Sequence, residues 1–136
     1  MINEEVRKWL IKAMNDYKTA EKLINLPEEE VITDTLCFPC QQAVEKLLKA
    51  FLINAGVDFG RVHSLEYLIK LCSNLDDEFE GLYEITANLT DSVVEVRYPD
   101  EFYIPTINEA QEAFESARRV KDFIFEKLKI KEEDLK

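Results

Sequence analysis

The residues best suited to chemistry lie in a proline-bounded segment near the end of the chain, residues 97–105, with the sequence RYPDEFYIP. The planar guanidinium of Arg97 suits a phosphate, and Tyr98 and Tyr103 can stack on a base or donate from their hydroxyls. Binding residues concentrate in irregular segments on rigid scaffolds. The segment therefore indicates a nucleotide or phosphate site. An interhelical loop with both tyrosines packed in the core and Arg97 paired with a carboxylate is the open alternative.

A second group of polar residues interrupts the stretch 35–56, which is otherwise apolar on almost all sides. At 100° per residue, a helix here carries its polar side chains on one narrow face. These are Gln42, Glu45, Lys46 and Lys49. Such a helix must be covered on several sides by other helices or by a second subunit, so the polar face either reaches solvent through a gap or faces a functional site. The alternative for Glu45 and Lys49 is an ordinary ion pair on a helix surface.

The single histidine and the three cysteines give weaker signals. His63 precedes a serine at a predicted helix start, where a histidine typically caps the helix or anchors a loop. Cys37 and Cys40 have the two-residue spacing of a redox or metal motif, but they lie in an apolar helical pattern. A zinc site would also need further ligands. We interpret them, with Cys72, as buried thiols of a reducing compartment and expect no metal and no cofactor.

Length and composition predict one all-α domain over residues 1–136. Glycine and proline are scarce, at 3 and 4 residues, whereas helix-forming residues are abundant. No apolar run approaches the ~20 residues of a membrane span, and the charged N-terminus is unlike a signal peptide, so we expect a cytoplasmic protein without membrane contact. The net charge of −11 argues against a duplex-DNA binder, because such proteins present a basic surface.

Hydrophobic periodicity predicts an up-and-down bundle of four to five helices. Thr33 or Asp34 caps the second helix, Ser64 caps the third, and Thr106 forms a capping box with Glu109 at the start of the last helix. The charged tail, residues 129–136, is expected to fray. In chain order, the predicted helices cover about residues 3–26, 35–56, a short third helix that opens at 63–65 and closes at 74–77, then about 77–96 and 106–128.

Three motifs, taken together, resemble a known family. They are FPCQQAVEKLLKA at 38–50, HSL at 63–65 with a leucine three residues later, and RYPD at 97–100. Their order and spacing are similar to those of the HEPN family, helical domains found in prokaryotic toxin–antitoxin and nucleotidyltransferase-linked proteins. The resemblance covers roughly residues 17–128. It implies a bundle that dimerises through its central helices. Many members of this family are metal-independent endoribonucleases. Their catalytic motif is an arginine followed after four to six residues by a histidine.

The family's catalytic motif is incomplete in this chain, since Arg97 matches the arginine but Tyr103 stands where the histidine is expected. Cleavage of RNA by its 2′-hydroxyl needs a proton acceptor that titrates near neutral pH, and tyrosines, with an ordinary pKa of ~10, are poor ones. The resemblance thus implies a catalytically weak or inactive protein. We expect such a protein to bind a nucleotide or RNA phosphate in a dimer-interface cleft and to work with a minimal nucleotidyltransferase, a partner that modifies a tyrosine in some members of the family. Arg97 and Tyr103 take the catalytic positions, and the cleft is lined by Gln42, Lys46, Lys49, His63 and Tyr98.

Two other functions stay open at this point. One is a metal-independent endoribonuclease toxin that uses Arg97 with Tyr103 or His63. The other is a structural or interaction module without a ligand, in which the polar face of the second helix only pairs its own charges.

Overall fold

The computed structural model describes residues 2–89 and 104–136, and all regular structure within these two ranges is helical. The predicted all-α fold is therefore confirmed. Short 3₁₀ segments join or follow the helices at Glu28–Glu30, Asp77–Gly81, Ala87–Leu89 and Glu132–Leu135. The α-helices are α1 (Glu4–Ile24), α2 (Thr33–Asn54), α3 (Leu65–Leu75), α4 (Leu82–Ile85) and α6 (Ile107–Leu128).

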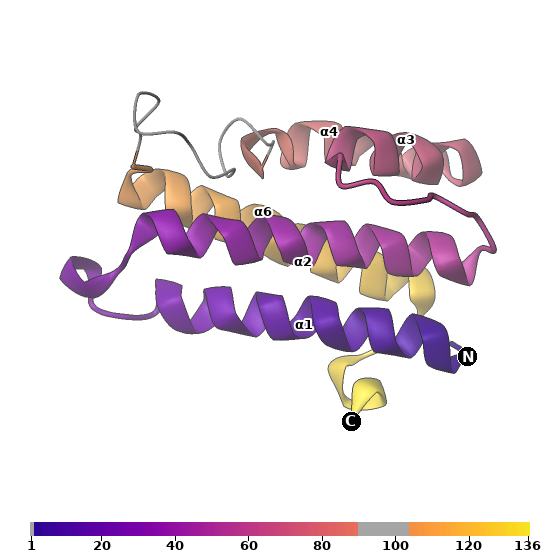
Figure 1. The fold of residues 1–136 in the computed structure, drawn as a ribbon, viewed down its shortest axis with the longest axis horizontal. Coiled ribbons are helices and arrows are strands. Elements are labelled where there is room, and N and C mark those ends of the chain that lie inside the picture. Colours follow the sequence, from indigo (N-terminus) through magenta and orange to yellow (C-terminus); the bar gives the residue numbers. More distant parts are fainter. Residues whose placement is uncertain (1, 90–103) are drawn as a thin grey trace.

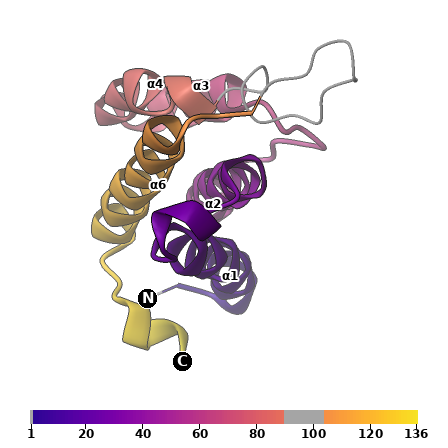
Figure 2. The same cartoon turned by 90° about the vertical axis from the view of Figure 1, so that its left-hand side faces the viewer.

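The helix α2 lies at the centre of the bundle. It runs antiparallel to α1, and α3 with α4 returns along its other side, while α6 lies behind α1 and α2 (Figure 1). Figure 2 shows α2 enclosed between α1, α6 and the layer made by α3 and α4. The alternating directions are those of the predicted up-and-down bundle. None of the helices in the described residues is both long and apolar enough to cross a membrane.

The cover that the apolar second helix requires is supplied within one chain. The side chains of Leu36, Val44, Leu47, Leu48 and Leu52 are completely buried against the neighbouring helices. Phe38 is the large apolar side chain of α2 that stays exposed, at 53%. The apolar character of the second helix, from which we predict a homodimer, is thus accounted for within one chain and does not itself require a second subunit. The homodimer stays a prediction that the family resemblance also implies.

The ends of the helices follow local capping rules where the residues involved are close in sequence. Ser64 accepts a hydrogen bond from the backbone N–H of Tyr67, and the capping box of Thr106 and Glu109 is complete, so both predicted caps are confirmed. The predicted cap of α2 is wrong, because the helix begins at Thr33 and its N-cap residue is Ile32. The Thr33 hydroxyl instead donates to the carbonyl of Pro105, 2.6 Å away, and so ties the start of α2 to the segment before α6.

The long fourth helix expected over residues 77–96 is wrong for its described part. The chain forms two 3₁₀ segments around the single turn of α4. Asp76 accepts a hydrogen bond from the N–H of Glu78 and so starts a new turn. This broken path lets Phe79, Leu82 and Leu89 all point into the core. Residues 90–96 lie outside the described ranges.

The charged C-terminal tail packs back onto the bundle, whereas the sequence led us to expect fraying. After α6 the chain turns at Lys129, whose φ is +58°, and forms the last 3₁₀ segment. Leu135 is buried, and the guanidinium of Arg7 on α1 donates to its carbonyl at 2.8 Å. Leu135 and the partly buried Ile130, with polar contacts from Arg7 and Lys121, hold the charged tail against the bundle.

Candidate ligand site on the central helix

A buried ion pair lies in the middle of the apolar helix α2. Glu45 and Lys49 are one turn apart, so their side chains meet on one face. The Nζ of Lys49 donates to Oε2 of Glu45 at 3.1 Å, and the two side chains are only 6% and 4% exposed. The predicted i,i+4 pair therefore forms, but it lies in the core rather than on the surface.

His63 joins this pair from the segment between α2 and α3. Its Nδ1 lies 3.1 Å from the same oxygen, Oε2 of Glu45. The imidazole is otherwise open to solvent, with 76% of the side chain exposed. The capping role at the start of α3 belongs to Ser64, so His63 is free to reach back to the central helix.

The second carboxylate oxygen of Glu45, Oε1, has no hydrogen-bond partner in the described part of the chain, although it is buried. Leaving a buried acceptor unsatisfied costs about 1–3 kcal/mol. Such atoms are rare in folded proteins and call for an explanation, such as a functional role or a bound group. This oxygen makes Glu45 the candidate ligand-binding residue of α2.

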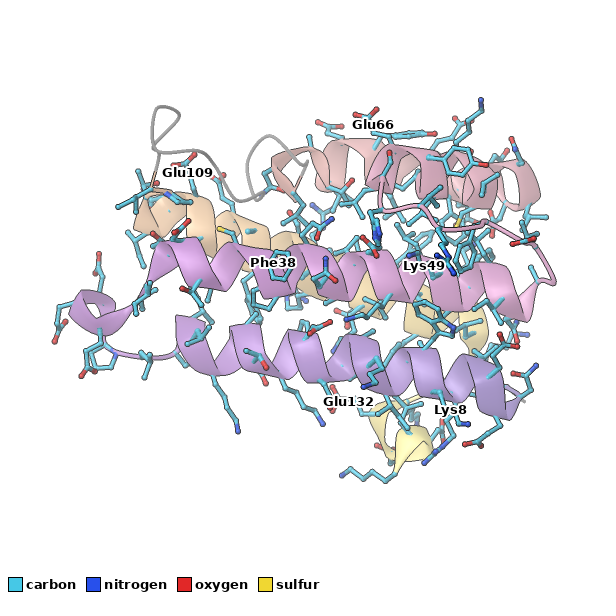
Figure 3. All side chains as sticks on the ribbon, in the orientation of Figure 1. Lys8, Phe38, Lys49, Glu66, Glu109 and Glu132 are labelled. Carbon is cyan, nitrogen blue, oxygen red and sulfur yellow. The ribbon has the colours of Figure 1, made fainter. Side chains whose placement is uncertain are left out.

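Two aromatic rings enclose the ammonium group of Lys49. Its Nζ lies 5.6 Å from the ring centre of Trp9 on α1 and 5.4 Å from that of Phe59 in the α2–α3 segment. The two rings meet edge to face at 6.1 Å. A cation over ring faces is stabilised electrostatically. Lys49 is therefore held inward by Glu45 and two rings, and Figure 3 shows it on the same side of α2 as Phe38.

The remaining polar residues of α2 divide between two directions. The Lys46 side chain extends to α1, where its Nζ donates a hydrogen bond to Oδ2 of Asp16 and forms an ion pair with it. Gln42, which is half-buried, donates from Nε2 to the side-chain oxygen of Gln41 at 2.9 Å. The polar residues predicted to share one face of α2 therefore contact two different elements. Glu45 contacts His63 of the α2–α3 segment, whereas Lys46 contacts Asp16 of α1.

The other three predicted site residues, Arg97, Tyr98 and Tyr103, lie outside the described ranges. Sequence reasoning missed Trp9 and Phe59, whose rings contact Lys49, and Asp16, which pairs with Lys46. No local spacing signal could have found them, because their positions depend on how α1 and the α2–α3 segment pack on α2.

The described residues also contain an open polar depression of about 700 Å³ on the other side of the bundle. It lies between the α4 region and the middle of α6, where the buried hydroxyl of Ser116 donates to Oδ1 of Asn88 at 3.0 Å. None of the predicted site residues within the described ranges lines it. Its lining includes Glu84, Asn88, Glu112, Glu115, Ser116 and Arg119.

The cysteines do not form a redox or metal site within the described residues. All three thiols are free and buried, and burial raises the pKa of Cys37 to about 11 and the pKa of Cys40 and of Cys72 to about 12. The thiolate is the reactive and metal-binding form, so these thiols are inert at neutral pH. No set of three His, Cys, Asp or Glu side chains in the described ranges is placed to hold a metal ion.

Comparison with known proteins gives a family and a structural neighbour. A family model described as HEPN domain matches residues 6–128. Among solved structures, ST0689, an archaeal HEPN homologue, aligns with a TM-score of 0.65 and 22% sequence identity, over 90% of this chain and 96% of that chain. At this identity the likeness concerns the fold alone. Comparison with curated protein sequences gives no match.

Proposed function

Since this chain belongs to the HEPN domain family, we propose that it binds a nucleotide or an RNA phosphate in a cleft at the interface of a homodimer and works with a minimal nucleotidyltransferase. The observation that carries this proposal is the buried ion pair of Glu45 and Lys49 in the middle of α2, together with the exposed His63 that reaches the same carboxylate from the α2–α3 segment. The proposal includes weak or absent catalysis, because Tyr103 replaces the histidine of the family's motif.

Burial makes the cluster difficult to explain by stability alone. Removing two charges from water costs several kcal/mol for each ion, and an apolar pair of similar volume is often at least as stable. The helix around the cluster is otherwise filled with leucine, alanine and valine. A local departure from the rules of a well-packed core is typical of a functional site.

Within the proposed cleft, the residues differ in what they offer a ligand. Glu45 repels a phosphate, whereas its free oxygen accepts a hydrogen bond from a hydroxyl or amino group of a nucleoside. Lys46 and Gln42 offer an ammonium and an amide at the edge of the cluster, and Lys46 must exchange Asp16 for the ligand. Arg97 supplies the bidentate phosphate contact by analogy with the family motif, with Tyr98 beside it.

Binding measurements test the proposal directly. Fluorescence anisotropy or calorimetry with nucleoside triphosphates and a short mixed-sequence RNA should give measurable affinity for at least one of them. Arg97→Ala should weaken that affinity about tenfold or more, because a hydrogen bond to a charged group contributes about 1.5–3 kcal/mol. Lys70→Ala, which changes an exposed lysine of α3, is the matched control and should have no effect. No affinity for any probe, or equal affinity in Arg97→Ala, contradicts the site.

The same samples test oligomeric state and catalysis. Light scattering at micromolar concentration should give a dimer, and a stable monomer would remove the interface cleft from the proposal. Single-stranded RNA should stay intact, or be cut only slowly, at neutral pH. Rapid cutting that is lost in His63→Ala or in Tyr103→Phe would favour the alternative of an endoribonuclease that uses Arg97 with one of these residues. Co-purification with a minimal nucleotidyltransferase tests the partner.

A further inference from the structure

The imidazole of His63 is fixed on one edge and open on the other. Nδ1 lies 3.1 Å from Oε2 of the buried Glu45, and 76% of the side chain is exposed. A carboxylate accepts hydrogen bonds, so in the neutral imidazole the proton is on Nδ1 and the lone pair is on Nε2. The packing of Glu45 in the core therefore presents Nε2 to solvent as an oriented nucleophilic nitrogen.

From this geometry we propose that His63 is a phosphoryl-acceptor site, modified at Nε2. In the transfer, the Nε2 lone pair attacks the phosphorus of a phosphoryl donor and forms an N–P bond. The bond from phosphorus to the leaving group breaks, and the leaving group departs with its electron pair. Nδ1 keeps its proton and its hydrogen bond to Glu45, whose negative charge stabilises the positive charge that develops on the ring. This proposal does not depend on nucleotide or RNA binding by the cluster.

The surroundings favour an acceptor over a catalytic base. A general base works in a site that holds its substrate and excludes water, whereas the ring of His63 is mostly exposed and does not line the depression described above. An exposed nitrogen is instead within reach of an external donor. Arg61, two residues earlier, is exposed and has no hydrogen bond or ion pair with the described residues. A free guanidinium at this distance along the chain suits a phosphoryl group, which carries about −1.5 to −2 charge when attached to a side chain.

The chain offers an unusually clean experiment because His63 is its only histidine. The purified protein is incubated with potassium phosphoramidate, a small donor whose leaving group is ammonia, and intact mass is followed with time. We expect the gain of one phosphoryl group, labile to acid, located at His63 by fragmentation and absent in His63→Ala. Failure to gain a phosphoryl group, or its location elsewhere, overturns the proposal.

The rate separates an oriented acceptor from a histidine that is merely exposed. Glu45→Gln keeps the shape of the side chain but removes its charge, and it should slow the transfer about tenfold, the factor that corresponds to about 1.4 kcal/mol. A synthetic peptide of residues 59–67, which contains the same histidine without Glu45, should react as slowly as this variant. Equal rates for the wild-type protein, Glu45→Gln and the peptide overturn the proposal.

Two controls exclude a trivial effect of the substitution. Glu66→Gln changes an exposed carboxylate of α3 three residues after His63 and should leave the rate unchanged (Figure 3). Circular dichroism and the pH profile of the rate are measured for Glu45→Gln. A folded variant with a lower rate and an altered profile supports an electrostatic role of Glu45. The charged groups that face the imidazole in this profile are Glu45 and, through the same oxygen, Lys49.

Discussion

Two ion-pair groups in this molecule have similar helical spacing in sequence and opposite environments. On α2, Glu45 and Lys49 are four residues apart, and their side chains are 4% and 6% exposed. On α6, Arg118 pairs with Glu115 and Asp122 at three- and four-residue spacing, and all three side chains are about half exposed. Spacing alone predicts the same helix-surface pair in both places. The tertiary environment makes one of them a core feature and leaves the other in water.

The difference matters because burial reverses the energetic role of a charge pair. In water, a pair such as that of α6 is screened, and its attraction is largely offset by the ordering of two long side chains. In the core, neither charge of the α2 pair can be solvated if the other is removed. The Arg118 guanidinium still holds the pKa of Glu115 below its usual range, chiefly through their hydrogen bond, but this carboxylate is exposed. The buried pair is thus the one whose disruption has consequences.

The largest expected effect is the removal of one partner of the buried pair. Lys49→Ala leaves Glu45 without its cation in the core and should lower the free energy of unfolding by about 3–5 kcal/mol. The double variant Glu45→Met with Lys49→Met removes both charges and should recover most of that loss. Urea denaturation followed by circular dichroism measures both. A loss below about 1 kcal/mol in Lys49→Ala would mean that the pair is not buried in solution.

Alkaline pH should destabilise the protein through its three buried thiols, which become exposed when the chain unfolds. Burial raises the pKa of the three thiols from 9.0 to about 11–12, so the folded state favours the protonated form. The stability that this burial contributes is complete below pH 9, the pKa of the unfolded thiols. It falls as pH rises above 9 and is fully lost once pH has passed the folded-state pKa of about 11–12. By linkage the loss at pH 10 is roughly 1 kcal/mol for each thiol. Urea unfolding under reducing conditions at pH 8 and pH 10 tests this, and Cys72→Ala should show a smaller alkaline loss than the wild type.

A local exposed contact should have an intermediate effect. Thr106 and Glu109 close the capping box of α6 with hydrogen bonds of 2.9 and 3.1 Å, which satisfy backbone N–H groups that the helix itself cannot. Thr106→Ala should therefore cost about 1 kcal/mol. Thr19→Ala, in an exposed position of α1, is the matched control, and thermal or urea unfolding compares the two. Equal effects of both substitutions would show that the cap contributes nothing specific.

The smallest effect is expected for the exposed pair of α6. Arg118→Ala should leave the free energy of unfolding unchanged within measurement error, because water and salt already solvate both carboxylates. Unfolding at low and at high salt is the relevant measurement. A clear destabilisation comparable to that of Lys49→Ala would show that spacing, rather than burial, decides the energetic role of a pair.

Agreement between the sequence and the structure is best where the interacting residues are close along the chain. The caps at Ser64 and Thr106 depend on contacts three residues apart, and both are present. The predicted helix at 77–96 is wrong in its described part because the core positions of Phe79 and Leu82 favour a broken path over a continuous helix. Thr33 satisfies the carbonyl of Pro105 instead of capping α2, a contact that no local rule contains.

In the candidate site, too, the contacts between residues close in sequence could be predicted, whereas the contacts between different elements could not. Helical spacing predicts that Gln42, Lys46 and Lys49 share one face of α2, and all three lie within that helix. The contact of His63 with Glu45 spans a turn of the chain, and the enclosure of Lys49 by Trp9 and Phe59 brings α1 and the α2–α3 segment together. These contacts depend on packing between elements, so residue spacing could not specify them.

The helical class of this protein, its family motifs and the polar face of its central helix follow from the order of neighbouring residues, since periodicity and capping are local properties. The burial of this face at Glu45 and Lys49, and the contact that holds one edge of His63 while the other stays open, come instead from packing between elements. The physical reason is that solvent exposure is set by which helices cover a side chain. That cover comes from residues far away in sequence.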